Sequence, residues 1–173
     1  MIYTRLQILL HWFSAILVLA LAFSGLSYTY DIGDWDALST HQFVGQVFIL
    51  FLLLRITVRF SRKPSQPNAI DETNWQTRLA ARLAKTVHIA LYLCLICFAV
   101  TGYVSASALT NSDLLFPVER SFARSDTGDI LLEIHYALKW VLLVLLCLHL
   151  AGALKQVIWG RPQTVSNMIK FKK

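Results

Sequence analysis

Residues 132–158, LEIHYALKWVLLVLLCLHLAGALKQVI, are an apolar run long enough to cross a bilayer, since a hydrocarbon core of about 30 Å needs about 20 helical residues. The run contains His135 near its start and His149 fourteen residues later. At about 1.5 Å per residue the two lie roughly 21 Å apart along a helix, and fourteen steps of about 100° return to within some 40° of the same face. The run therefore predicts a membrane helix that presents two imidazoles to one side, at two depths.

Three further runs have the length of a membrane span, at about residues 6–28, 40–60 and 86–109. The first and third contain no Asp, Glu, Lys or Arg. Over the whole chain of 173 residues, 56% are hydrophobic and 15% charged, a balance too apolar for an ordinary soluble domain. The sequence predicts an all-α membrane protein, a four-transmembrane-helix bundle that forms one domain over residues 1–173.

The charged residues between the spans predict the topology. The connection 59–85 carries six basic residues against Asp71 and Glu72, whereas segment 28–40 carries three aspartates and no basic residue. Lys and Arg accumulate in cytoplasmic loops of membrane proteins, and the chain closes with Arg161, Lys170, Lys172 and Lys173. We therefore predict that both termini are cytoplasmic, and we assign the net charge of +6 to topology and not to nucleic-acid binding.

All five histidines lie within or at the start of these spans: His11, His41, His88, His135 and His149. Ionisable residues inside a membrane are costly and suggest function. Their predicted depths place His41 and His135 together near the outer surface (the outer pair). His11 and His149 are placed together near the inner surface (the inner pair). Each pair could supply both axial ligands of a haem held between helices. The alternative is a set of unrelated helix–helix hydrogen bonds.

Two haems at two depths would form a two-step electron path. An iron with both axial positions filled has no vacancy for oxygen, which favours outer-sphere electron transfer. Small residues near the ligands could admit a flat macrocycle, although ordinary helix packing explains them as well; they are Gly45, Gly102 and Gly152.

Three more residues are candidates near the pairs, each with an alternative. Arg55 lies at the depth of the inner pair and could neutralise a haem propionate or reach to the interface. His88 could compete with His149 for the inner site, bond a propionate, line a quinone site, or join two helices. Lys139, one turn from His135, could contribute a positive field that attracts anionic donors.

Several motifs resemble the bacterial cytochrome b561 family over almost the whole chain. They are Tyr3-Thr4-Arg5-Leu6-Gln7-Ile8 with His11-Trp12, His41 with Val44-Gly45, Leu54-Arg55, His88 with Tyr92, and His135 with His149. The fourteen-residue spacing is also similar to that of the haem b subunits of formate dehydrogenases and nickel–iron hydrogenases. The resemblance implies two haem b groups and a quinone that is reduced near the inner haem. Some members of the family are superoxide oxidases that reduce ubiquinone, and others are membrane subunits of a separate dehydrogenase.

Together these observations predict a di-haem cytochrome of the bacterial inner membrane that moves electrons between a periplasmic-side donor, superoxide or a redox protein, and the quinone pool. Arg5, Arg55 and His88 are the candidates for its propionate or quinone environment. One departure is Lys155-Gln156-Val157, where several relatives carry a His pair. The alternatives are a metal or proton transporter that uses the membrane histidines and a membrane anchor for a separate dehydrogenase.

Overall fold

The computed structural model describes residues 4–61, 75–109 and 118–158, and the regular structure in these ranges is entirely helical. The elements are α1 (Arg5–Tyr30), α2 (Ala37–Ser61), α3 (Trp75–Leu109), α4 (Arg120–Ala123) and α5 (Asp126–Ile158). Helices α1, α2 and α5 and residues Arg78–Ala108 of α3 are long and apolar enough to cross a membrane. The predicted all-α fold with four spans is confirmed.

Two helices, α3 and α5, begin well before the expected spans. Helix α3 starts at Trp75 and not near 86, so that the basic residues from 78 to 85 lie on a helix; Arg, Lys and Ala are good helix formers, which explains the extension. Helix α5 starts at Asp126, with acidic residues in its first turn, where they interact favourably with the helix dipole. The expected basic residues Arg62, Lys63 and those of the C-terminal tail lie outside the described ranges.

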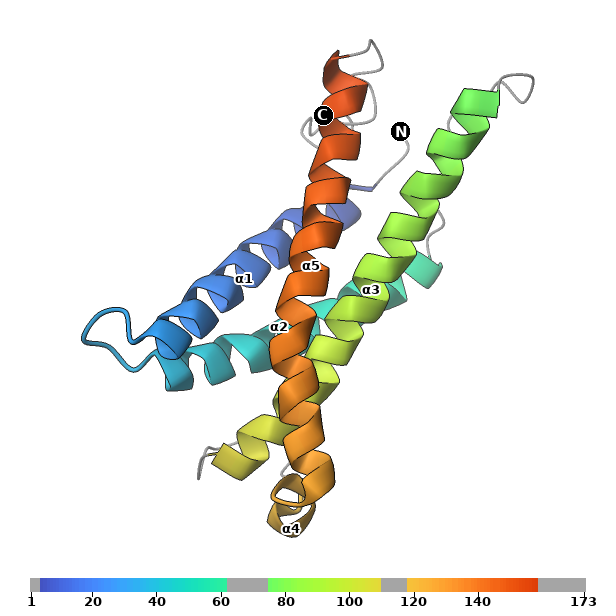
Figure 1. Cartoon of the computed structure of the whole chain (residues 1–173). Helices are drawn as coiled ribbons and strands as arrows, with labels where there is room; N and C mark the ends of the chain where they lie inside the picture. Colours follow the sequence, from blue (N-terminus) through green and yellow to red (C-terminus); the bar gives the residue numbers. More distant parts are fainter. Residues whose placement is uncertain (1–3, 62–74, 110–117, 159–173) are drawn as a thin grey trace.

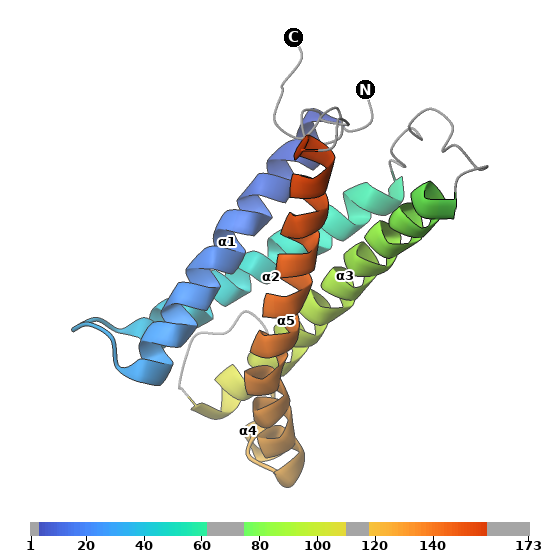
Figure 2. The same cartoon turned by 45° about the horizontal axis from the view of Figure 1, so that its top comes forward.

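The helices form two closely packed pairs, α1 with α2 and α3 with α5, which meet mainly through α2 and α3. Figures 1 and 2 show α1 beginning and α5 ending at the same end of the bundle. Leu17, Phe48 and Leu52 form a buried cluster between α1 and α2, and side chains of α3 pack against it. Many large apolar side chains on all the long helices are exposed, as expected for a surface that faces lipid.

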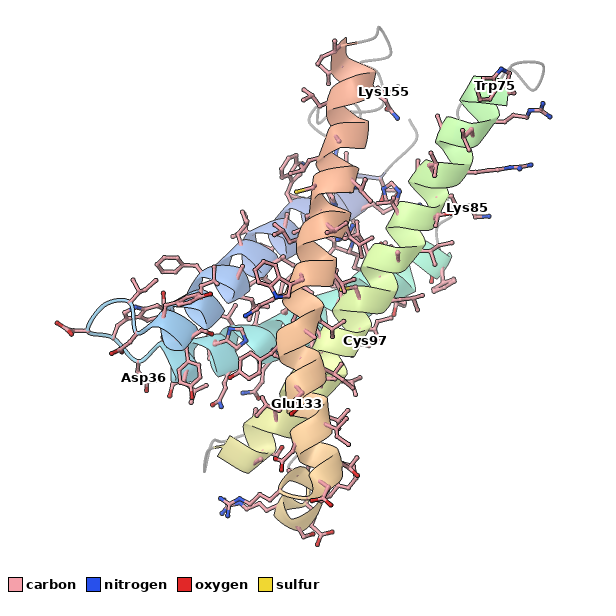
Figure 3. The ribbon with its side chains drawn as sticks, in the orientation of Figure 1. Asp36, Trp75, Lys85, Cys97, Glu133 and Lys155 are labelled. Atoms are coloured by element: carbon pink, nitrogen blue, oxygen red, sulfur yellow. The ribbon has the colours of Figure 1, made fainter. Side chains whose placement is uncertain are left out.

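The two ends of the bundle differ in charge. Figure 3 shows Lys85 and Lys155 toward the end where α1 begins. Asp36 and Glu133 lie toward the opposite end. This polarity agrees with the charge pattern that predicts the topology, and the cytoplasmic placement of the basic end stays a prediction.

Local hydrogen bonds define the start of α1 and the turn that follows it. Thr4 and Gln7 form a reciprocal capping box at the start of α1. Asp31 ends α1 in the left-handed region, with φ of 52°. Asp36 accepts a hydrogen bond of 3.0 Å from the backbone N–H of Ser39, and hydrogen bonds from Ser39 lower the pKa of this carboxyl. The bond satisfies one of the free N–H groups in the first turn of α2.

Gly128, in the first turn of α5, is required because that turn lies directly against the end of α4. A Cβ at this position would collide with the backbone carbonyl of Ala123, which cannot move aside as a side chain can. We expect Gly128→Ala to destabilise the protein by about 1–3 kcal/mol, the usual cost of overpacking, measured as thermal unfolding in detergent. Thr127→Ala, at the exposed neighbouring position, is the control, and equal stability of the two variants would contradict the assignment.

Candidate functional site

The outer pair joins α2 to α5 near the acidic end of the bundle. The ring centroids of His41 and His135 are 6.2 Å apart, and the rings are perpendicular, at 89°. Both histidines line a cavity of about 380 Å³ whose walls come from α1, α2, α3 and α5. Most of the lining residues are apolar, and Lys139 lies among the polar ones, which include Gln42, Gln46 and Ser105.

The inner pair joins α1 to α5 near the basic end. The ring centroids of His11 and His149 are also 6.2 Å apart, at an interplanar angle of 63°. His88 of α3 lies beside this pair, with its ring centroid 5.1 Å from that of His149. Arg55 of α2 also reaches the pair, because its Nη2 lies 3.0 Å from Nδ1 of His11.

The spacing within each pair can be compared with what an iron between two imidazoles requires. A metal–imidazole bond is about 2 Å long and the ring adds about 1 Å on each side, so that trans rings lie roughly 6 Å apart between centroids. Both predicted pairs match this distance, whereas His88 and His149 are closer together. In the parts of the chain that the structure describes, no three His, Cys, Asp or Glu side chains gather as metal ligands. Each pair offers two imidazole ligands. A porphyrin supplies four ligands to its iron, so that two remain for the protein to supply.

The two pairs differ in what holds their Nδ1 atoms. Nδ1 of His41 lies 3.0 Å from the carbonyl oxygen of Leu21 and 3.1 Å from Oγ of Ser24. Because a carbonyl can only accept, this Nδ1 carries the proton and Nε2 keeps its lone pair. Nδ1 of His135 lies 3.1 Å from Oγ1 of Thr101. Both outer rings therefore have neutral oxygen partners.

His11 has the opposite arrangement. A guanidinium can only donate, so that Nδ1 of His11 accepts the bond from Arg55. A neutral His11 ring then carries its proton on Nε2. His11 can offer Nε2 to a metal only after Arg55 gives up this hydrogen bond.

Two glycines lie directly against the outer rings. A Cβ on Gly102 would be 2.7 Å from Cε1 of His135, and a Cβ on Gly25 would be 3.2 Å from Cε1 of His41. A Cβ on Gly45 would meet only Leu21 at 3.9 Å, and one on Gly152 would meet nothing within 4 Å. Gly102 was among the glycines singled out in the sequence, whereas Gly25 was missed. The signal that could have revealed Gly25 is a dipeptide of a hydroxyl residue and glycine that occurs at both places, as Ser24-Gly25 and Thr101-Gly102.

The remaining candidates surround the pairs. Arg55 lies over the ring of Tyr92, 5.3 Å from its centroid. His88 is exposed, and its Nδ1 donates to the carbonyl of Ala84 in its own helix, at 2.6 Å. Arg5 is the exposed first residue of α1. Of the three candidates for the quinone or propionate environment, Arg55 and His88 are thus in contact with the inner pair.

A known protein family matches this chain over nearly its whole length. The sequence model of prokaryotic cytochrome b561 matches residues 2–171. The chain belongs to the prokaryotic cytochrome b561 family. One relative in this family is cytochrome b561 homolog 2 of Escherichia coli (strain K12), which is 30% identical over 168 residues, covering 92% of this chain and 86% of the relative. No solved structure matches the chain.

Membership in the cytochrome b561 family makes the chain a multi-pass protein of the bacterial inner membrane, a b-type cytochrome that transfers electrons. Its cofactor is haem b, which supplies the one-electron couple when bound. The outer site fits this cofactor because two imidazoles at the required spacing face a largely apolar cavity. The inner pair fits in spacing, once Arg55 releases His11.

Proposed function

We propose that this cytochrome b561 family member binds two haem b groups and passes electrons from a periplasmic-side donor, superoxide or a redox protein, to the quinone pool. The outer pair would hold one haem and the inner pair the other. The observation that supports this proposal is the equal ring spacing of 6.2 Å in two pairs that share α5. Their α5 members are fourteen residues apart, or roughly 21 Å along the helix, so that the pairs lie toward opposite surfaces.

The contribution of the protein is chiefly to position the haems and exclude water. The two histidines of each pair would hold the iron of one haem b, which would supply a one-electron couple for outer-sphere transfer. The largely apolar walls of the outer cavity would disfavour water beside the haem. Lys139 lines the same cavity, where its positive charge would favour the approach of an anionic donor such as superoxide.

The inner end offers polar groups for a propionate or a quinone. For His11 to bind iron through Nε2, Arg55 must leave Nδ1 of that ring, and the released guanidinium would then pair with a carboxylate such as a haem propionate. In its neutral form the ring of His88 carries its proton on Nδ1, because the carbonyl of Ala84 accepts a hydrogen bond from that atom. Its Nε2 is therefore an acceptor that could receive a hydrogen bond from a quinol hydroxyl. Arg5, at the start of α1, is the third candidate at this end.

Replacement of Arg55 tests its part in the inner site. A nearby positive charge stabilises the reduced haem, so we expect Arg55→Met to lower the midpoint potential of the inner haem by the equivalent of about 1–2 kcal/mol, the scale of a charge interaction at an effective dielectric constant of about 20. Redox titration followed by visible absorption measures this shift. Arg59→Met, one turn further along α2 and exposed, is the matched control. An equal shift in both variants would show a general charge effect and not a contact of Arg55.

The proposed function is tested with the purified full chain. A reduced-minus-oxidised spectrum and a haem assay should show haem b at two groups per chain. In proteoliposomes that contain ubiquinone, superoxide supplied outside should reduce the quinone. One haem per chain, or a folded but colourless protein, would show the two-haem proposal to be wrong. If the protein holds two haems but reduces quinone only when a separate dehydrogenase is added, that dehydrogenase and not superoxide is the donor.

A further inference from the structure

We propose that Ser24 and Thr101 are positioning residues for the outer haem: their hydroxyl oxygens accept hydrogen bonds from Nδ1–H of His41 and His135, help to hold both rings in that form and leave both Nε2 atoms for the iron. The inference rests on the proposed function, because it concerns the ligands of the outer haem. It assigns a role to two residues that the motifs of the sequence did not single out.

The direction of the hydrogen bonds follows from the protons available. A serine or threonine hydroxyl has one proton to donate. Ser24 donates its proton to the carbonyl of Ala20, at 2.9 Å. Thr101 donates its proton to the carbonyl of Cys97, at 2.7 Å. With that proton committed, each hydroxyl oxygen can only accept from the histidine beside it, which requires the proton of that ring to be on Nδ1.

A second acceptor supports the assignment for His41. The carbonyl oxygen of Leu21 lies 3.0 Å from the same Nδ1 and cannot donate, so that it requires the same tautomer without reference to the hydroxyl. The hydroxyls are also shielded from solvent, because Ser24 is 1% exposed and Thr101 is 5% exposed. Water therefore does not readily replace either bond if the hydroxyl is removed.

The same construction occurs twice, on different helix pairs. Ser24-Gly25 of α1 contacts His41 of α2, and Thr101-Gly102 of α3 contacts His135 of α5. In each case the hydroxyl bonds the ring nitrogen and the following glycine lets the ring edge approach the backbone. Two unrelated polar contacts would not be expected to share this order of residues.

The inner pair shows the opposite electrostatics. There the positive charge of Arg55 lies beside the pair, whereas neutral acceptors face Nδ1 of both outer rings. An acceptor on Nδ1–H raises the basicity of an imidazole ligand, which stabilises ferric iron and lowers the reduction potential. The arrangement thus favours electron transfer from the outer haem to the inner haem.

The test removes each hydroxyl and keeps the shape of the residue, with Thr101→Val and Ser24→Ala in the haem-loaded protein. We expect the potential of the outer haem to rise, so that the equilibrium constant for transfer from the outer to the inner haem falls up to tenfold, a change that corresponds to about 59 mV for one electron. The low-spin ferric EPR signal of the outer haem, which reports ligand basicity and orientation, should shift with it. Thr101→Ser and Ser24→Thr should restore both values.

Matched controls separate the hydroxyl effect from packing. Ser27→Ala removes a buried hydroxyl from the helix of Ser24, and Ser107→Ala removes one that bonds the carbonyl of Tyr103 in the helix of Thr101. Both controls should leave the potential of the outer haem unchanged.

Each result supports or overturns the inference. If Thr101→Val and Ser24→Ala keep both haems with unchanged potentials and EPR signals, the positioning role is wrong while the proposed function stands. If Thr101→Val or Ser24→Ala loses the outer haem, the result is compared with Thr101→Ser or Ser24→Thr, which keep a hydroxyl. If the hydroxyl variant keeps the outer haem, the positioning role is supported. If it also loses the outer haem, the effect comes from packing and the role is wrong. A wild-type protein without an outer haem would instead refute the proposed function.

Discussion

Replacement of His135 by alanine is expected to remove the outer haem and leave the inner haem in place, so that the purified protein falls from two haems per chain to one. The cavity beside His135 offers His41 as the imidazole at the spacing of a second axial ligand, and one imidazole alone holds haem b weakly because haem b has no covalent link to the chain. His41→Ala should therefore give the same loss. A haem assay and the visible spectrum of the remaining haem measure both.

The inner pair provides the complementary experiment. His11→Ala and His149→Ala should each remove the inner haem and keep the outer haem, and quinone reduction should fall to the background rate because the second step of the path is missing. His88→Ala should keep both haems, since His11 and His149 already supply two imidazoles at the required spacing and Nδ1 of His88 is bonded within its own helix. If His88→Ala loses the inner haem while His149→Ala keeps it, the inner pairing is wrong.

Gly102→Ala is expected to weaken haem binding at the outer site almost as strongly as loss of His135 or His41, although both histidines are retained. The added Cβ would lie 2.7 Å from Cε1 and 3.1 Å from Nδ1 of His135. The ring of His135 could move away only by losing its hydrogen bond to Thr101 and by changing its distance from the ring of His41. Overpacking of this kind costs about 1–3 kcal/mol, which is roughly a 5- to 150-fold loss of haem affinity. Haem retention during dilution, followed separately for the two haems, measures the effect.

Gly25→Ala is the graded comparison. Its Cβ would lie 3.2 Å from Cε1 of His41, so that a shift of a few tenths of an ångström relieves the contact. We expect a smaller loss of outer haem than in Gly102→Ala, and the inner haem should serve as the internal reference in both. Equal retention of the outer haem in Gly102→Ala and in the wild type would show that this glycine does not confine His135.

The number and position of the membrane helices followed from the sequence. A backbone in lipid has to satisfy its hydrogen bonds within the helix, so that an apolar run of sufficient length has few alternatives to a spanning helix. The depth of each histidine follows from the same one-dimensional geometry, at about 1.5 Å per residue. The depth pairs His41–His135 and His11–His149 could therefore be predicted, and the structure places the members of each pair 6.2 Å apart.

The rotation of each helix about its axis, and its choice of neighbours, appear only in the folded bundle. Apolar side chains surround α5 on all sides, so that hydrophobic periodicity marks no inward face. For this reason the sequence did not reveal the contact of Gly25 with His41, the hydroxyl partners of the outer rings, or the contact of His88 with His149. Apolar length and charge predicted the depth of the residues in each span, because the membrane acts along one axis. Contacts between helices depend instead on side-chain shape around each helix and required the packed structure.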